Sequence, residues 1–227
     1  MAIVDALLQI ESFRGVSLAK TVADMETRLV GTKASDVLAV NSGARIDKSL
    51  IASAAQVKRA CAQIDVVIHT VGILYSLPYL LEEGEIVETV SLGAGNASSD
   101  FDLVTNRRIA EFKFIYWQGG SEAVRKKTFF QDYFKLVREQ THKAKFLYLL
   151  NTQIPLMFLR GTSNVFRMLD RNQRLRDDFQ ARYGTRFQTV GDFYLSHKDV
   201  VTLVNLVDLV PGLGIYVGLQ DAQDEAV

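Results

Sequence analysis

The spacing of apolar residues changes several times between residues 48 and 151. Apolar residues that recur at helical spacing predict amphipathic helices, and alternating apolar and polar residues predict half-buried strands. A continuous apolar run of strand length is typical of an interior strand. In chain order the segments are a helix at 48–81, strands at 85–92, 100–105 and 109–117, a helix at 121–140 and a strand at 145–151. This order predicts an α/β core built as helix, three strands, helix, strand.

The segments on either side of this core are mainly helical in pattern. Two amphipathic stretches precede residue 30, and turn-forming residues follow up to residue 47. After the core come an Arg-rich helix near 163–182, a short strand or helix from 187, and an apolar segment at 199–210. We therefore expect an N-terminal helical extension at 1–47 packed on the core, a core at 48–151, and a C-terminal helical and mixed extension of the same domain at 152–227.

Composition excludes several classes of protein. The 26 basic and 26 acidic residues cancel, so the chain is not coated with basic residues as a histone is, although a local basic groove remains open. The single cysteine, Cys61, excludes an internal disulfide and a cysteine-based zinc site. No basic segment precedes the first apolar residues, so we expect no signal peptide. The apolar run 66–81 contains His69, Gly72 and Pro78 and predicts a buried helix, and hence a cytoplasmic protein without a membrane span.

The strands at 100–105 and 109–117 are joined by a very short turn, which fixes how their residues pair. An even loop around Asn106 and Arg107 places Asp102 opposite Glu111. Because side chains alternate between the two faces of a sheet, one face is expected to carry a charged cluster and the other an apolar surface. The charged face would hold Asp100, Asp102, Glu111 and Lys113, and the apolar face Phe101, Leu103, Ala110, Phe112 and Phe114.

Two carboxylates that face each other across a hairpin repel, and such a pair makes sense when a cation lies between them. Mg²⁺ prefers hard oxygen ligands and commonly takes one or two carboxylates with water and substrate phosphate. Lys113 projects to the same side, where it can hold a phosphate or lower the cost of forming hydroxide, so the set suits metal-assisted hydrolysis of a phosphodiester. The alternative is a surface ion pair of Glu111 with Lys113, which leaves Asp102 unexplained. Asp100 fits a strand start better than a metal ligand.

The sequence FDLVT, followed after a short turn by IAEFK, resembles the signature of the PD-(D/E)xK nuclease superfamily, with an Asp on one strand and Glu-x-Lys on the next. The common core of that superfamily is helix, three strands, helix, strand. The resemblance therefore implies a restriction-endonuclease-like core over residues 48–151, under half of the chain, with Mg²⁺ as cofactor and Mn²⁺ able to substitute. By position, Asp102 and Glu111 match the metal ligands, the backbone carbonyl of Phe112 matches a further ligand, and Lys113 matches the residue that orients or activates the attacking water.

The resemblance also implies supporting residues. Gln118 and Arg125 match polar residues that the family often uses to support the site or the phosphate, and ordinary helix-terminus residues are the alternative. The auxiliary acid often found on the first helix has no clear counterpart, and Asp65 is the best candidate, with Glu82 or Glu83 behind it. No Pro precedes the motif Asp, although many members lack it. The three histidines of the chain are isolated, so we expect them in the core or on the surface.

Basic residues gather in two parts of this neutral chain. There are ten Lys and Arg against six Asp and Glu at 100–145, and seven Arg against three Asp at 160–186. A groove that binds a phosphate backbone needs such positive charge. The nucleic-acid-binding candidates are Arg107, Arg108, Arg125, Lys126 and Lys127. The alternative is that these residues lie on solvated helix faces.

These features together predict a Mg²⁺-dependent nuclease that acts on DNA rather than RNA. The alternative function is a catalytically inactive nuclease-fold protein that acts in nucleic-acid binding or protein assembly. The missing acid on the first helix and the length of chain outside the core favour this alternative. Dimerisation is common among such folds where both strands are cut, so a homodimer is compatible with the first reading.

Overall fold

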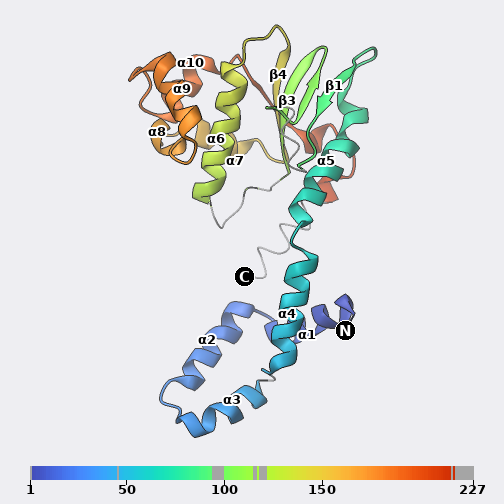
Figure 1. The fold of residues 1–227 in the computed structure, drawn as a ribbon, viewed down its shortest axis with the longest axis vertical. Helices are drawn as coiled ribbons and strands as arrows, with labels where there is room; N and C mark the ends of the chain where they lie inside the picture. The colour runs from blue at the N-terminus through green and yellow to red at the C-terminus, as the bar shows by residue number, and fades with distance from the viewer. Residues whose placement is uncertain are drawn as a thin grey trace. The chain divides into compact units, whose positions relative to one another are not determined.

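A computed structural model describes residues 2–44, 46–93, 100–114, 117, 122–215 and 217. Its contacts divide the chain into two compact units, of which the first runs to Asp65 and the second covers Val66–Gln220 (Figure 1). The first unit therefore extends beyond the expected boundary at residue 47. The second unit contains the strands of the expected core together with the C-terminal segment.

The first unit is helical, and the two helices expected before residue 30 are both present. Hydrogen bonds from side chains begin two of its helices: the Ser17 hydroxyl accepts from the Lys20 N–H, and the Asp47 carboxylate accepts from the N–H groups of Ser49 and Leu50. Residues 31–47, where turns were expected, also form a short helix. The elements are α1 (Ile3–Arg14), α2 (Leu18–Leu29), the 3₁₀ turn η1 (Ala34–Asp36), α3 (Val37–Gly43) and α4 (Lys48–Ala60).

The single helix expected at 48–81 is divided into α4 and a second helix, α5 (Ile64–Leu80). The expectation that α5 is a buried helix is wrong for much of its surface. Ile73 and Ser76 are fully buried, but Val71 is 57% exposed and Leu74 is 49% exposed. By length and composition alone, the segment Lys48–Leu80 is apolar enough to cross a membrane, a test that some helices of soluble proteins also pass.

The second unit is a mixed α/β structure. The strands, the helix expected at 121–140 and a C-terminal group of short helices all appear in it. After α5 the elements are β1 (Val87–Val90), β2 (Leu103–Thr105), β3 (Arg108–Lys113), α6 (Glu122–Arg138), β4 (Ala144–Leu149), α7 (Gln153–Leu159), α8 (Val165–Met168), α9 (Gln173–Tyr183), α10 (Val190–His197), β5 (Thr202–Asn205) and η2 (Leu206–Asp208). The expected order of helix, three strands, helix, strand is therefore present from α5 to β4.

The five strands form one mixed sheet in the order β1-β2-β3-β4-β5. The β1–β2 and β2–β3 pairs are antiparallel, and the β3–β4 and β4–β5 pairs are parallel. Leu103 pairs with Ala110 and Val104 pairs with Ile109, which confirms the register predicted for the hairpin. The residues next in line at its open end are Asp102 and Glu111.

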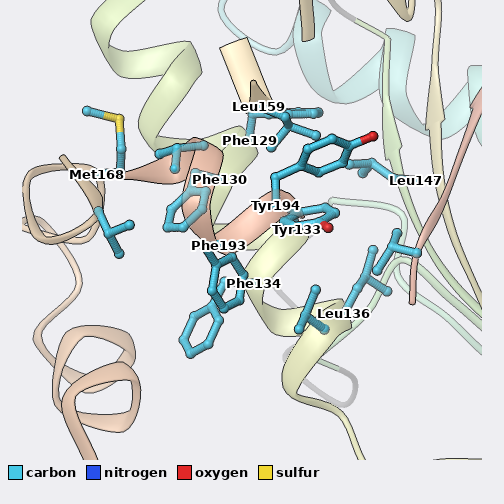
Figure 2. Close-up of a cluster of buried hydrophobic side chains, with 14 of the residues drawn as sticks. Phe129, Phe130, Tyr133, Phe134, Leu136, Leu147, Leu159, Met168, Phe193 and Tyr194 are labelled. Carbon is cyan, nitrogen blue, oxygen red and sulfur yellow. The ribbon is translucent and has the colours of Figure 1, made fainter. Parts of the chain in front are cut away.

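Helices cover both faces of the sheet, with α5 on one side and α6 on the other (Figure 1). Ala110 and Phe112 of β3 pack on the α5 side, as expected. Phe101 is a correction, because it lies before β2 begins and packs into the α6-side cluster instead. Figure 2 shows that cluster, in which aromatic side chains of α6 meet Phe193 and Tyr194 of α10. The charged residues of β3 therefore emerge beneath α6 rather than on an open surface.

Gly72 lets α5 lie close to the sheet, and we expect Gly72→Ala to destabilise the protein. A Cβ atom at this position would lie 2.6 Å from ring carbons of Phe114, so the helix or the ring would have to move. Overpacking of this kind costs about 1–3 kcal/mol, against a gain of about 1 kcal/mol in helix propensity. Urea unfolding measures the difference. Gly43→Ala in α3 is the control, because no atom lies within 4 Å of its added Cβ, and equal stability of the two variants would contradict the prediction.

Candidate active site

The three motif residues meet at one end of the β2–β3 hairpin. Asp102 immediately precedes β2, and Glu111 and Lys113 lie in the last half of β3. Glu111 and Lys113 share the face of β3 that is covered by α6, whereas Phe112 between them packs on the α5 side. Asp102 lies at the edge where the antiparallel pairing stops. The hairpin register thus brings the predicted residues together.

Two residues of α6 complete a buried ionic network with β3. The Lys113 Nζ atom lies 2.6 Å from Asp132 Oδ2 and 3.8 Å from Glu111 Oε2. The Lys135 Nζ atom lies 2.6 Å from Asp132 Oδ1 and 3.5 Å from Glu111 Oε1. Each lysine therefore contacts both carboxylates, and the four charges balance. Glu111 and Asp132 are each only 4% exposed, so the alternative of a solvated surface pair between Glu111 and Lys113 is wrong.

Asp102 links the hairpin to α5. Its Oδ2 atom accepts a hydrogen bond of 2.9 Å from the Phe112 N–H, and its Oδ1 atom lies 3.4 Å from His69 Nε2. The N–H and C=O of one strand residue point to the same edge of the strand, so the Phe112 carbonyl lies on the edge that faces Asp102. Two carboxylates and a carbonyl near one strand end are hard oxygen donors, and this donor set fits Mg²⁺ or Mn²⁺.

The network shifts the ionisation of its members in opposite directions. Burial raises the pKa of Glu111 well above the usual glutamate value, and the neighbouring Asp132 carboxylate raises it further, against the opposing effect of Lys113. Burial alone would lower the pKa of Lys113, but Asp132 and Glu111 outweigh it and raise this pKa. Burial would raise the pKa of Asp102, but the contact with His69 and the charge of Lys113 lower it instead.

The raised pKa of Glu111 predicts a pH dependence of stability in EDTA. The folded protein holds this proton at pH values where the unfolded chain has lost it, so this contribution is fully present below the ordinary glutamate pKa and is lost as pH rises through the raised value. The lowered pKa of Asp102 acts only below the ordinary aspartate range, outside this window. We expect Glu111→Gln, whose amide stays neutral, to gain stability relative to the parent between pH 5 and pH 8, by at most ~1.4 kcal/mol per pH unit. Urea unfolding at both pH values tests this, and parallel pH profiles of the two proteins would contradict it.

The supporting residues expected from the sequence have different outcomes. Asp65 is exposed, and within the described ranges no hydrogen bond or ion pair connects it with the cluster; His69, one helical turn further on, contacts Asp102. Gln118 lies outside the described residues. Glu82 pairs with Arg107 rather than with the site, and Asp100 is exposed, in agreement with the reading that it is not a ligand.

Sequence reasoning missed His69, Asp132 and Lys135. Asp132 and Lys135 are three residues apart on a helix that was expected, and this spacing places them on one face, but the sequence did not indicate that the face meets Glu111. His69 was expected in the core or on the surface, although it lies four residues after the acid proposed for the same helix. The missing information in both cases is which helix face packs on the open end of the hairpin.

Arg108 is a correction to the expected nucleic-acid interface. It is 6% exposed, and its guanidinium donates two hydrogen bonds of 2.6 Å to Glu85 and one of 3.0 Å to the Tyr148 hydroxyl. Arg108 begins β3 and Lys113 ends it, so this buried ion pair lies at the opposite end of the strand from the cluster. Arg107 adjoins the same end and pairs with Glu82 at 2.9 Å.

The other expected phosphate-binding residues lie at the start of α6. Lys126 pairs with Glu122 at 2.9 Å, and Lys127 pairs with Asp170 at 2.6 Å. Arg125 is half-buried and, together with Lys113, lines a small cavity. Basic side chains therefore lie beside the cluster here, and acidic neighbours neutralise part of their charge.

Comparison of the chain with protein-family models, curated proteins and solved structures found no match. Within the described ranges, no group of three or more His, Cys, Asp and Glu side chains is arranged to hold a metal ion. The functional reasoning below therefore depends on the geometry of Asp102, Glu111 and Lys113 and on the order of elements that carries them.

Proposed function

We propose that this protein is a metal-dependent nuclease with a restriction-endonuclease-like core, acting on DNA. The observation that carries the proposal is the meeting of Asp102, Glu111 and Lys113 at the open end of one hairpin. The order helix, three strands, helix, strand around that hairpin supports it. Burial supports it too, because two carboxylates beside each other in a nearly dry site are costly unless cations compensate them.

Asp102, Glu111 and the Phe112 carbonyl would hold Mg²⁺, or Mn²⁺ in its place. The ion, when bound, supplies Lewis-acid polarisation of the phosphate and lowers the pKa of a bound water. Glu111 must be ionised to act as a ligand, so protons compete with the metal at this residue.

Lys113 acts in this proposal as a cation rather than as a base. Its raised pKa keeps the ammonium charged at neutral pH, so it would stabilise the hydroxide nucleophile and the phosphate charge by electrostatics. The ion pair with Asp132 fixes the ammonium beside Glu111. Arg125, Lys126 and Lys127 of α6 would contact the DNA backbone, and Arg108 is no longer among the proposed contacts.

The first experiment incubates the purified protein with supercoiled plasmid in Mg²⁺, Mn²⁺ or EDTA, beside Glu111→Gln. The proposal expects nicking that needs the metal and that Glu111→Gln abolishes. Glutamine keeps the size of the buried side chain, so loss of nicking in a folded variant points to lost metal binding. Nicking that persists in EDTA or in the variant would overturn the proposal.

The second candidate is a catalytically inactive nuclease-fold protein that binds nucleic acid or assembles with other proteins. The observation in its favour is that both lysines already contact Glu111, so the network is charge-balanced without a metal. Thermal unfolding with Mn²⁺ separates the candidates, because an intact site is stabilised by mass action and Glu111→Gln should lose that response. No shift in either protein would favour the inactive scaffold.

The expected homodimer and cytoplasmic location remain predictions. Sedimentation of the purified protein over a range of concentrations tests the first. Fractionation of the cells in which the protein occurs tests the second.

A further inference from the structure

A small cavity lies directly beside the proposed catalytic cluster, where the ends of β3 and β4 meet the first half of α6 and the start of α7. It has a volume of about 160 Å³. Its walls are mostly apolar, with cationic and polar groups among them. The apolar lining residues are Trp117, Val124, Phe129, Leu149 and Pro155, and the polar ones are Lys113, Arg125, Thr128 and Asn151.

Trp117 makes one aromatic wall of this cavity. Its ring centroid lies 5.4 Å from that of Phe129 and 5.8 Å from that of Phe158, and the residue is only 6% exposed. Its indole Nε1–H has no hydrogen-bond partner, although the atom is buried. Buried donors are nearly always satisfied, so an orphan donor in a cavity wall indicates a missing acceptor.

The polar residues connect the cavity with the proposed chemistry. Lys113 belongs both to the lining and to the ionic network with Asp132 and Glu111. Arg125 provides a second cation on α6. A group seated in the cavity is therefore covalently close to the position where Lys113 would meet a phosphate.

We propose that this cavity receives one unstacked nucleobase of the substrate, next to the phosphate that is cleaved. An apolar protein cavity of about 150 Å³ accepts a molecule the size of benzene, so the volume here suits a single aromatic ring with its substituents. Ring nitrogens and carbonyls of bases are the acceptors that the Trp117 Nε1–H lacks. Arg125 would meet the adjoining phosphate.

The proposal deepens the proposed nuclease function and names its substrate class as unpaired DNA. A base in a duplex is stacked and paired, and extracting it costs a few kcal/mol, whereas a single strand or an overhang presents it freely. Contact with an aromatic side chain repays binding regardless of sequence, because every base has a π-face. The enzyme should therefore favour single strands or frayed ends over intact duplex.

Trp117 reports on the cavity directly, because it is the only tryptophan in the chain. The experiment titrates a single-stranded oligonucleotide into the protein in EDTA, where no metal-dependent cleavage occurs, and follows tryptophan emission. We expect a saturable change with the single strand and at least a tenfold weaker response with the blunt duplex of the same sequence. No change, or an equal change with the duplex, would overturn the proposal.

Filling the cavity supplies the matched variants. Val124→Phe and Thr128→Phe place a ring in the lining from positions at the protein surface, and Leu195→Phe on α10 makes a comparable change at a site 64% exposed and outside the lining. Each cavity variant should weaken single-strand binding about tenfold or more, and Leu195→Phe should bind as the parent does. Unchanged affinity in a folded cavity variant would overturn the proposal. Plasmid nicking without a Trp117 response would reject the cavity and leave the nuclease standing, and the reverse result would reject the nuclease alone.

Discussion

Lys113→Ala is expected to slow metal-dependent cleavage of DNA at least a hundredfold. The variant loses the one charge that the structure places beside Glu111 from the same strand, and electrostatic or proton-transfer assistance at such a position is worth about 10²–10⁴ in rate. Cleavage of labelled single-stranded DNA under single-turnover conditions with Mg²⁺ or Mn²⁺ measures the effect. DNA binding in EDTA should change much less, because Lys113 is one of several cations near the site.

Lys135→Ala is the matched control for this prediction. Lys135 also contacts Glu111 and Asp132, at 3.5 and 2.6 Å, so both variants remove one charge from the same buried network. If Lys113 is catalytic, only its variant should lose the rate at matched thermal stability, and Lys113→Arg should keep the fold with a partial rate. Equal losses in the two alanine variants would assign Lys113 a structural role and contradict the proposal.

The core was predictable because its signals are local. Alternation in two short segments around Asn106 and Arg107 leaves few ways to pair them, and the observed pairing of Leu103 with Ala110 follows from that turn. The same register brings Asp102 near Glu111. The parallel position of β4 next to β3 agrees with its continuous apolar sequence, because such strands are covered on both faces.

The misplaced residues are those whose partners lie far away in the chain. Asp132 and Lys135 meet Glu111 only because α6 crosses that end of β3, and periodicity gives the apolar face of a helix but not the residue beneath each turn. His69 reaches Asp102 from a helix more than thirty residues earlier. The apolar face of α5 was expected to be buried, yet Val71 and Leu74 remain half-exposed, since hydropathy records no packing partner.

Arg108→Leu is expected to destabilise the protein by about 3 kcal/mol, the lower end of the range for breaking a buried ion pair. The side chain of Glu85 is fully buried and that of Arg108 is 7% exposed, so the variant leaves a carboxylate without its bidentate partner. The Tyr148 hydroxyl loses a donor as well. Urea unfolding at pH 7 measures the loss. Because the pKa of Glu85 is lowered, by Arg108 and Thr105 against the opposing effect of burial, the loss should shrink as pH falls through the ordinary glutamate range.

Arg107→Leu is the neighbouring control, because Arg107 and its partner Glu82 are 46% and 65% exposed and such a pair contributes about 0–1 kcal/mol. The double variant Arg108→Leu with Glu85→Leu should regain part of the lost stability, since neither buried charge then remains alone. Nucleic-acid binding by folded Arg108→Leu should equal that of the parent. A stability loss no larger than that of Arg107→Leu, or a selective loss of binding, would restore Arg108 to the nucleic-acid interface that its sequence position suggested, and it would move that interface to the end of β3 opposite Lys113.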